Sequence, residues 1–219
     1  MRPAGRRATL EGVADDDREQ TRPWGAAHRR FDVLTVCTAN LCRSPIAEAV
    51  LRHELATLPG AWSVRSAGTD ARAGRPVHPD SARALAEHDL ALPEGWRSRQ
   101  LRADDVARAD LVLTANRAHR AKVLGLLPSA SARVFTLRQF VRLLAAARTQ
   151  PPLDTTGFDH PGEWLLASAG AARGLAVPQR PEDDDVADPI GRPYKVFREL
   201  ADDLVDLAAA VSSAVPVLR

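Results

Sequence analysis

The sequence contains one short segment in which a cysteine, an arginine and a serine are spaced for phosphate chemistry. It runs from Cys37 to Pro45, and five residues separate Cys37 from Arg43. A loop of this length can turn several backbone N–H groups toward one centre, and a helix that begins after it adds its own N–H groups and the positive end of its dipole. Such an array suits a tetrahedral dianion. The segment therefore predicts a site that binds an oxyanion and attacks it.

Each polar side chain of this loop has an expected task. Arg43 can bind two oxygens of the anion in a bidentate fork. The same positive field favours the thiolate of Cys37, which is the reactive form, and the Ser44 hydroxyl can donate a hydrogen bond to it. A thiolate at the floor of a phosphate site is a nucleophile that accepts a phosphoryl group. Alone, Cys37 could be a buried strand-end residue and Arg43 a surface cation, but the set in a strand–loop–helix context indicates catalysis.

The segments around the loop must place the cysteine at the end of a strand. Residues 31–36 form an almost continuous apolar run, which is typical of a central parallel strand. After the loop, apolar residues recur with a helical period over 45–58, and Pro45 suits a helix start. The pattern further predicts strands over 62–69, 110–114 and 132–137, and helices over 79–90, 117–127, 139–147, 164–173 and 194–211.

The alternation of strands and helices sets the expected fold class. It favours an α/β fold of a single domain, with a four-stranded parallel sheet and helices on both faces. Ligands of such sheets bind at the carboxyl ends of the strands, where the Cys37 loop lies. We expect the domain over 31–215, with an insertion at about 142–186. A disordered N-terminal tail is expected over 1–30, where neither helical nor strand periodicity is found.

Composition argues against several functional classes. The 219-residue chain has a formal net charge of +2, and its arginines are spread widely, so nothing marks a nucleic-acid binder. No apolar run approaches the length of a membrane span, and no signal-peptide stretch begins the chain. Both cysteines, Cys37 and Cys42, lie in the loop, which suits a reducing compartment and offers too few ligands for a metal. We expect a soluble, cytoplasmic monomer without metal or cofactor, and with no nucleic-acid or membrane partner.

Residues 36–49 resemble the signature of the low-molecular-weight protein tyrosine phosphatase family. Two shorter motifs agree with it: Ser66-Ala67-Gly68-Thr69 resembles the second loop of that family, and Asp188-Pro189 resembles its acid loop. The resemblance extends from residue 31 to about residue 207 and is weakest over 142–186. It implies a flavodoxin-like domain of the phosphotyrosine phosphatase I type. It also implies a hydrolase that dephosphorylates a phosphorylated protein or a small aryl phosphate through a phosphocysteine intermediate.

The resemblance implies a role for each matching residue. Cys37 is the nucleophile, and Arg43 binds the phosphoryl group. Asp188 is the general acid, which protonates the leaving group and then takes a proton from the attacking water. Ser66 and His88 support the loop asparagine by hydrogen bonds. The rest of the phosphate loop binds the substrate: Thr38, Ala39, Asn40, Leu41, Cys42 and Ser44.

Three of these assignments have plainer alternatives. Asp188 follows the acidic run 183–185 and could be solvated like it, although Pro189 fixes the backbone beside it. His88 could be a surface histidine at the end of a helix. Cys42 could merely fill space in the loop, whereas the resemblance implies a reversible disulfide between Cys42 and Cys37 that protects the nucleophile from over-oxidation.

Other functions are compatible with parts of the sequence. A protein arginine phosphatase of the same fold resembles this loop but carries threonine at the position of Leu41, so the branched apolar side chain favours an aryl phosphate. A thioredoxin-coupled arsenate reductase needs further cysteines outside the loop, and the chain has none. A catalytically silent module that binds phosphate or phosphoproteins is the third alternative. Two departures from the family suggest such a module. Ala39 stands where the family usually has glycine, and Ile190-Gly191 stands where eukaryotic members have a pair of tyrosines.

Overall fold

The computed structural model describes residues 30–216, so residues 1–29 of the expected tail lie outside the described residues. Arg30, which the sequence analysis assigned to the tail, is instead the first residue of strand β1 (Arg30–Cys37). Its place in the strand follows from pairing, because Arg30 is opposite Ala61 at the start of β2 (Ala61–Gly68). The assignment of Arg30 to the tail is therefore wrong.

The predicted strands and helices are confirmed, with ends that move by a few residues. Strands β3 (Leu111–Thr114) and β4 (Val134–Thr136) complete the sheet. One helix, α3 (Ala103–Arg108), was not predicted, because six residues are too few to show a helical period. The other helices are α1 (Arg43–Leu55), α2 (Pro79–Ala86), α4 (Arg117–Leu126), α5 (Leu137–Ala147), α6 (Pro161–Ala171) and α7 (Tyr194–Ser212), and the 3-10 helices are η1 (Pro128–Arg133) and η2 (Pro181–Asp184).

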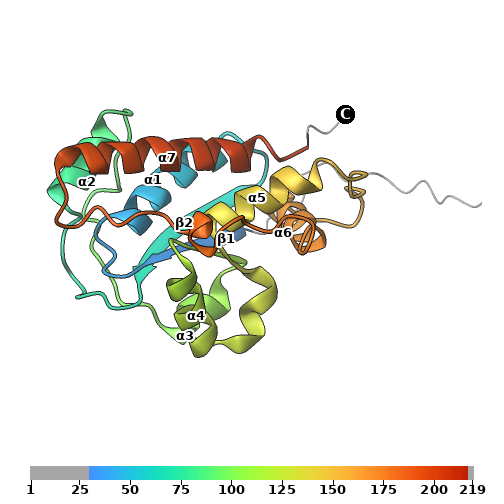
Figure 1. Cartoon of the computed structure of the whole chain (residues 1–219), viewed down its shortest axis with the longest axis horizontal. Coiled ribbons are helices and arrows are strands. Elements are labelled where there is room, and N and C mark those ends of the chain that lie inside the picture. The colour runs from blue at the N-terminus through green and yellow to red at the C-terminus, as the bar shows by residue number, and fades with distance from the viewer. Residues whose placement is uncertain (1–29, 217–219) are drawn as a thin grey trace, which may run out of the picture.

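The four strands form one parallel sheet in the order β2-β1-β3-β4. Alternate residues of β1 enter two different cores: Val33 and Cys37 face one layer, and Leu34 and Val36 face the other. Helices α1, α5, α6 and α7 cover the first face, and α3 and α4 cover the second (Figure 1). The α/β fold with a four-stranded parallel sheet and helices on both faces is confirmed.

Helix α7 completes the layer of helices that contains α1, the helix that follows the Cys37 loop. It packs along α1 and α2 (Figure 1), and its buried face includes Phe197, Leu200, Leu204 and Ala208. This spacing of three and four residues produces the single apolar stripe of an amphipathic helix. Because α7 lies against α1, the segment that precedes α7 is brought back toward the loop from which α1 begins.

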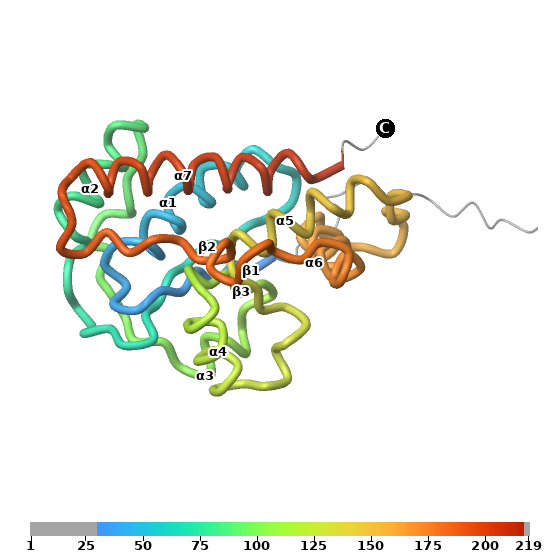
Figure 2. The backbone as a smooth tube through the Cα atoms, in the orientation of Figure 1, coloured from blue at the N-terminus to red at the C-terminus, as the bar shows by residue number. Residues whose placement is uncertain are grey.

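The segment between α6 and α7 returns across the molecule to the carboxyl ends of the strands (Figure 2). Two contacts hold it there. Arg142 of α5 forms a bidentate ion pair with the buried Asp184, and the Val186 N–H donates to the Ala115 carbonyl just after β3, at 2.7 Å. Residues beyond 186 are therefore delivered to the sheet edge where ligands of this fold class bind. That residues 142–186 are an insertion in a domain over 31–215 stays a prediction.

Helix α6 docks on the start of β1 through a tight contact that depends on a glycine. A Cβ atom at Gly162 would lie 2.6 Å from the ring of Phe31, which also stacks on His160 at 5.3 Å between ring centroids. In the same helix, a Cβ at Gly170 would meet nothing within 4 Å. The two positions share helical backbone but differ in the space around them.

We predict that Gly162→Ala lowers the free energy of unfolding by about 1–3 kcal/mol, because the methyl group overpacks against Phe31. The matched control, Gly170→Ala, should be neutral or stabilising by up to about 1 kcal/mol, as expected for alanine in an open helical position. Urea denaturation of both variants measures the difference. Equal changes in the two variants would contradict the account of how α6 docks.

Candidate active site

The phosphate loop lies between the end of β1 and the start of α1 and is clamped by the loop that follows β2. The Thr69 N–H donates to the Cys37 carbonyl and the Asp70 N–H to the Thr38 carbonyl, both at 2.9 Å. The approach is so close that a Cβ at Gly68 would lie 2.4 Å from the Thr38 carbonyl oxygen and 2.8 Å from the Asn40 nitrogen. Glycine in the predicted Ser-Ala-Gly-Thr motif is thus required by the neighbouring loop.

The backbone of the loop leaves a set of donors without protein acceptors. Within residues 30–216, no carbonyl or side chain accepts a hydrogen bond from the N–H groups of residues 39–42. Arg43 is already the first residue of α1, so the helix N-terminus adds further free N–H groups beside them. Unsatisfied N–H groups at a buried helix start form an anion site. A cavity of about 30 Å³ opens here, and Cys37, Ala39 and Cys42 are among its lining residues.

Cys37 and Ser44 face each other across this loop. The Cys37 sulfur lies 3.0 Å from the Ser44 hydroxyl oxygen, and both side chains are buried. At this distance the Ser44 hydroxyl can donate a hydrogen bond to the sulfur when Cys37 is a thiolate. The sequence prediction that the two residues meet is confirmed.

Asn40 holds the loop in an uncommon conformation. Its φ angle is +55° and its side chain is fully buried, and asparagine tolerates this left-handed region better than most residues. Its amide group donates to Ser44 Oγ at 3.0 Å and to Ser66 Oγ at 2.8 Å, and its carbonyl oxygen accepts from the Arg99 N–H at 2.9 Å. The prediction that Ser66 hydrogen-bonds the asparagine is confirmed.

The network continues to residues that the sequence analysis missed. Ser66 donates to the buried carboxylate of Glu48 at 2.6 Å, and the Trp96 indole N–H donates to the same oxygen at 3.0 Å. Glu48 was detectable, since it lies four residues after Ser44 and so on the same face of α1. Trp96 gave no such signal, because it lies in a loop whose path only the fold determines.

His88 does not belong to this network. Its Nε2 lies 2.9 Å from the Asp202 carboxylate of α7, and the donors to Glu48 and Asn40 come from other residues. Residue 88 follows the end of α2, which packs on α7 rather than on the phosphate loop. The prediction that His88 supports Asn40 is therefore wrong, and the further donor in this network is Trp96, which donates to Glu48.

Arg43 and Asp188 meet at the mouth of the loop. The Arg43 side chain is 7% exposed, and one of its Nη atoms donates to Asp188 Oδ2 at 2.5 Å and to Thr38 Oγ1 at 3.3 Å. Asp188 is about half exposed. The other acids of the run have different partners: Asp183 pairs with Arg180, Asp184 with Arg142 and Asp185 with Arg117. Of these acids, the ion pairs single out Asp188 as the one at the loop.

A buried histidine, also missed from the sequence, lies behind Thr38. His119 Nε2 lies 2.8 Å from Thr38 Oγ1, and within the described part of the chain its Nδ1 atom has no hydrogen-bond partner. Burial, with a further contribution from the charge of Arg43, lowers the pKa of His119 to about 4. His119 is therefore neutral at physiological pH, and its ring anchors the hydroxyl that Arg43 also contacts.

Cys42 is a thiol rather than a second nucleophile. Both cysteines are free and buried, and burial raises the pKa of Cys42 to about 11. At neutral pH, Cys42 is thus protonated. The disulfide between Cys37 and Cys42 implied by the family resemblance stays a prediction.

Comparison with known proteins agrees with this site. The sequence profile of the family described as low molecular weight phosphotyrosine protein phosphatase matches residues 32–155. The fold and site thus define a cysteine-based phosphatase, which is an enzyme. The chain belongs to the low molecular weight phosphotyrosine protein phosphatase family.

Individual relatives fall into two functional groups. A probable low molecular weight protein-tyrosine-phosphatase, EpsP of Ralstonia nicotianae, is 39% identical over 105 residues, which are 48% of this chain and 69% of the relative. A protein-arginine-phosphatase of Geobacillus stearothermophilus is 29% identical over 177 residues, 81% of this chain and 90% of the relative. The solved structure of the YwlE arginine phosphatase of that organism is 28% identical and covers 84% of this chain and 91% of its own, with a TM-score of 0.59.

Across residues 30–216, none of the helices combines the length and the apolar character that a bilayer span requires.

The buried His119 predicts a pH dependence of stability. The unfolded histidine has a pKa near 6.5, whereas that of the folded one is about 4, so the unfolded state binds more protons as the pH falls through this window. Stability should therefore be full above pH 6.5 and should decline toward pH 4. We expect a loss of about 2 kcal/mol between pH 7.5 and pH 5 from this residue.

Urea denaturation at the two pH values measures the loss in the wild type and in His119→Gln. The variant cannot titrate, so its stability should fall by about 2 kcal/mol less than that of the wild type over the same interval. An equal pH dependence in both proteins would show that His119 is not buried in its neutral form.

Proposed function

We propose that this enzyme hydrolyses phosphotyrosine or a related aryl phosphate through a phosphocysteine intermediate. One observation carries the proposal: Cys37 Sγ lies 3.0 Å from a buried hydroxyl at the floor of a loop whose N–H groups are free, while Arg43 and Asp188 meet at its mouth. Nucleophile, anion site, phosphate-binding cation and proton donor are thus within one loop and the segment beside it.

In the first step, the Cys37 thiolate attacks phosphorus. A sulfur–phosphorus bond forms and the bond to the aryl oxygen breaks, and that oxygen takes a proton from the carboxylic acid of Asp188. Arg43 and the N–H groups of residues 39–42 bind the three remaining phosphoryl oxygens. Because Arg43 pairs with Asp188, a bound phosphoryl group must take over that contact. Asp188 is then free to face the leaving oxygen.

In the second step, water attacks the phosphocysteine. The Asp188 carboxylate takes the proton of the water, a phosphorus–oxygen bond forms, and the phosphorus–sulfur bond breaks to return the thiolate. Ser44 stabilises the departing thiolate. A related solved structure supports such an intermediate: a YwlE arginine phosphatase variant, 25% identical with a TM-score of 0.60, has a phosphorylated serine in place of its active-site cysteine.

The walls of the cavity favour an aryl group. Leu41 and Ile190 both line it beside Asp188, and Ile190 is 51% exposed. Two apolar side chains at the mouth match the faces of an aromatic ring and offer nothing to a phosphorylated guanidinium, which must keep its hydrogen bonds to water. Arginine phosphatase activity is the second candidate, because the Geobacillus relative aligns over 81% of this chain.

We further propose that the enzyme acts as a monomer in the cytoplasm, on phosphorylated proteins and without nucleic-acid or membrane partners or a cofactor. The chemistry supports this location, since the nucleophile must stay reduced and both cysteines are free.

The first test is phosphate release from 4-nitrophenyl phosphate in the presence of a chelator. We expect turnover by the wild type and none by Cys37→Ser, because serine is not ionised at neutral pH. Turnover that survives in Cys37→Ser would contradict the cysteine mechanism. Phosphopeptide binding without any turnover by the folded, reduced wild type would favour the silent binding module.

Asp188→Asn tests the general acid. We expect kcat/KM for phenyl phosphate, which reports the first step, to fall about 10²–10⁴-fold, and kcat/KM for an activated ester such as 2,4-dinitrophenyl phosphate to fall far less, because a good leaving group needs no proton. Asp183→Asn is the matched control, since Asp183 pairs with Arg180 away from the loop. Similar losses for the two esters, or in the two variants, would remove Asp188 from this role.

Leu41→Thr tests the substrate preference. The wild type should hydrolyse a phosphotyrosine peptide with a higher kcat/KM than the matching phosphoarginine peptide. The variant should shift this ratio toward phosphoarginine by about tenfold, which corresponds to one hydrogen-bonding group in a closed site. A wild-type preference for phosphoarginine would assign this enzyme to the second candidate function.

A further inference from the structure

Three exposed arginines surround the mouth of the phosphate loop without acidic partners. Arg72 and Arg75 lie on the loop that follows β2, and Arg192 lies just after the segment that carries Asp188. We define these three residues as the arginine rim. In the part of the chain that the structure describes, no carboxylate pairs with any of them, whereas eleven other arginines there have at least one acidic partner.

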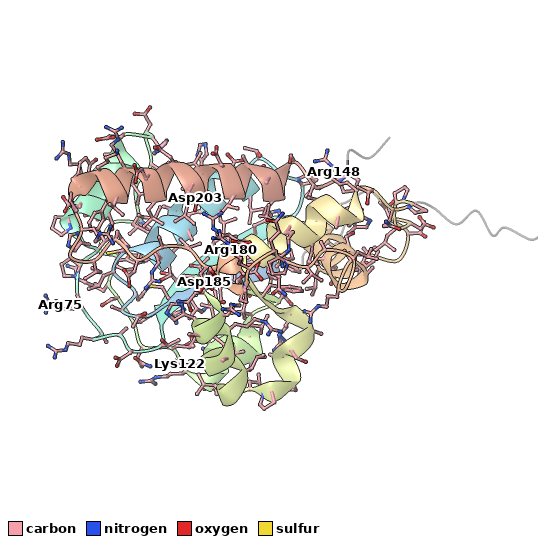
Figure 3. The ribbon with its side chains drawn as sticks, viewed as in Figure 1. Arg75, Lys122, Arg148, Arg180, Asp185 and Asp203 are labelled. Carbon is pink, nitrogen blue, oxygen red and sulfur yellow. The ribbon has the colours of Figure 1, made fainter. Side chains whose placement is uncertain are left out.

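The backbone contacts place both sides of the rim at the active site. The loop with Arg72 and Arg75 is joined to the phosphate loop at both ends: Asp70 N–H donates to the Thr38 carbonyl at 2.9 Å, and His78 N–H donates to the Leu41 carbonyl at 3.0 Å. On the other side, the Arg192 N–H donates to the Pro189 carbonyl at 3.0 Å, directly after the general acid proposed above. Figure 3 shows Arg75 at the outer edge of this side of the molecule.

A buried serine fixes the backbone that carries two of these arginines. Ser98 Oγ donates to the Arg72 carbonyl at 2.7 Å and accepts from the Arg75 N–H at 3.0 Å, and the Ser98 N–H donates to the Arg75 carbonyl at 2.8 Å. Ser98 is 2% exposed. The backbone that carries Arg72 and Arg75 is therefore held in place, so a ligand that binds there has to order only their side chains.

The charge around the mouth is unbalanced. Asp70, exposed and adjacent in the same loop, offsets one of the three rim charges, and Asp188 is paired with Arg43. The excess is positive, although the whole chain carries only +2. An excess of one sign at the edge of a site concentrates ligands of the opposite sign and raises their association rate.

We propose that the arginine rim binds carboxylate side chains that flank the phosphorylated residue, so that the enzyme selects acidic phosphopeptide segments. This inference rests on the proposed function and extends it from the phosphoryl group to the surrounding sequence. The rim lies outside the catalytic cavity, so it acts on peptide binding and leaves the chemistry of the phosphoryl group to the loop.

Charge reversal with three substrates tests the proposal. The variant Arg72→Glu/Arg75→Glu/Arg192→Glu is compared with the wild type on an aspartate-flanked phosphotyrosine peptide, a lysine-flanked one and 4-nitrophenyl phosphate. The matched control is Arg148→Glu, an exposed arginine that lies at the other end of the molecule from Arg75 (Figure 3). The small ester also reports whether the triple variant is folded.

We expect kcat/KM for the acidic peptide to fall roughly tenfold in the triple variant, through KM, since each exposed ion pair contributes a factor of about 1.4 to 5. The lysine-flanked peptide should gain, and 4-nitrophenyl phosphate should change less than about twofold. The wild-type preference for the acidic peptide should weaken as ionic strength rises, because the Debye length falls from about 10 Å at 0.1 M salt to about 3 Å at 1 M. Arg148→Glu should behave as wild type.

Equal changes for all three substrates, or no change for the acidic peptide, would overturn the rim proposal while leaving the phosphatase function intact. If the wild type releases no phosphate from any substrate, the proposed function fails first. Binding of the same peptides to the Cys37→Ser protein, measured by fluorescence anisotropy, then tests the rim alone. A preference for the acidic peptide that the triple variant abolishes supports the rim, and equal affinity for both peptides contradicts it.

Discussion

The site depends on a stretch of backbone that the protein itself leaves unsatisfied. Within residues 30–216, no protein group accepts a hydrogen bond from the N–H groups of residues 39–42, so these groups form no internal hydrogen bonds that would keep the loop in shape. The surrounding structure must therefore hold the loop open against collapse. It does so from three directions: the backbone clamp of the β2 loop at Gly68, the buried amide of Asn40, and the start of α1 at Arg43.

The network behind Asn40 explains why this arrangement is rigid. Asn40, Ser66 and Glu48 form a chain in which each donor has a specific acceptor, and Trp96 donates to its end. A buried carboxylate is stable only when it is paired and hydrogen-bonded, and Glu48 is also paired with Arg52 at 2.6 Å. The hydrogen bonds that stabilise the buried Glu48 carboxylate in α1 therefore also fix the side chain of Asn40, the residue with the left-handed backbone conformation in the loop.

Much of this could be predicted from the sequence, because the required signals are local. The apolar strand, the Cys-to-Arg spacing and the helix period lie within residues 31–58, and the parallel sheet follows from alternating elements. The errors came from contacts between distant segments. His88 follows the end of α2, and because α2 packs on α7, His88 contacts Asp202. Trp96 lies in the loop after it and contacts Glu48. The local sequence does not show which of the two residues reaches the network. His119 was missed for the same reason, since Thr38 is 81 residues away.

The pairing of Arg43 with Asp188 links stability to turnover. A guanidinium that is 7% exposed would be costly without a counter-ion, so the general acid proposed above also neutralises this buried cation. In the proposed mechanism, a phosphoryl group carries more charge than one carboxylate and binds the Arg43 fork through two oxygens, so it displaces Asp188 toward the leaving group. When inorganic phosphate departs, Asp188 can return to Arg43, and this competition limits how tightly product is held. The ion pair offsets the burial of the cation, and in the proposed mechanism it also positions the acid and favours product release.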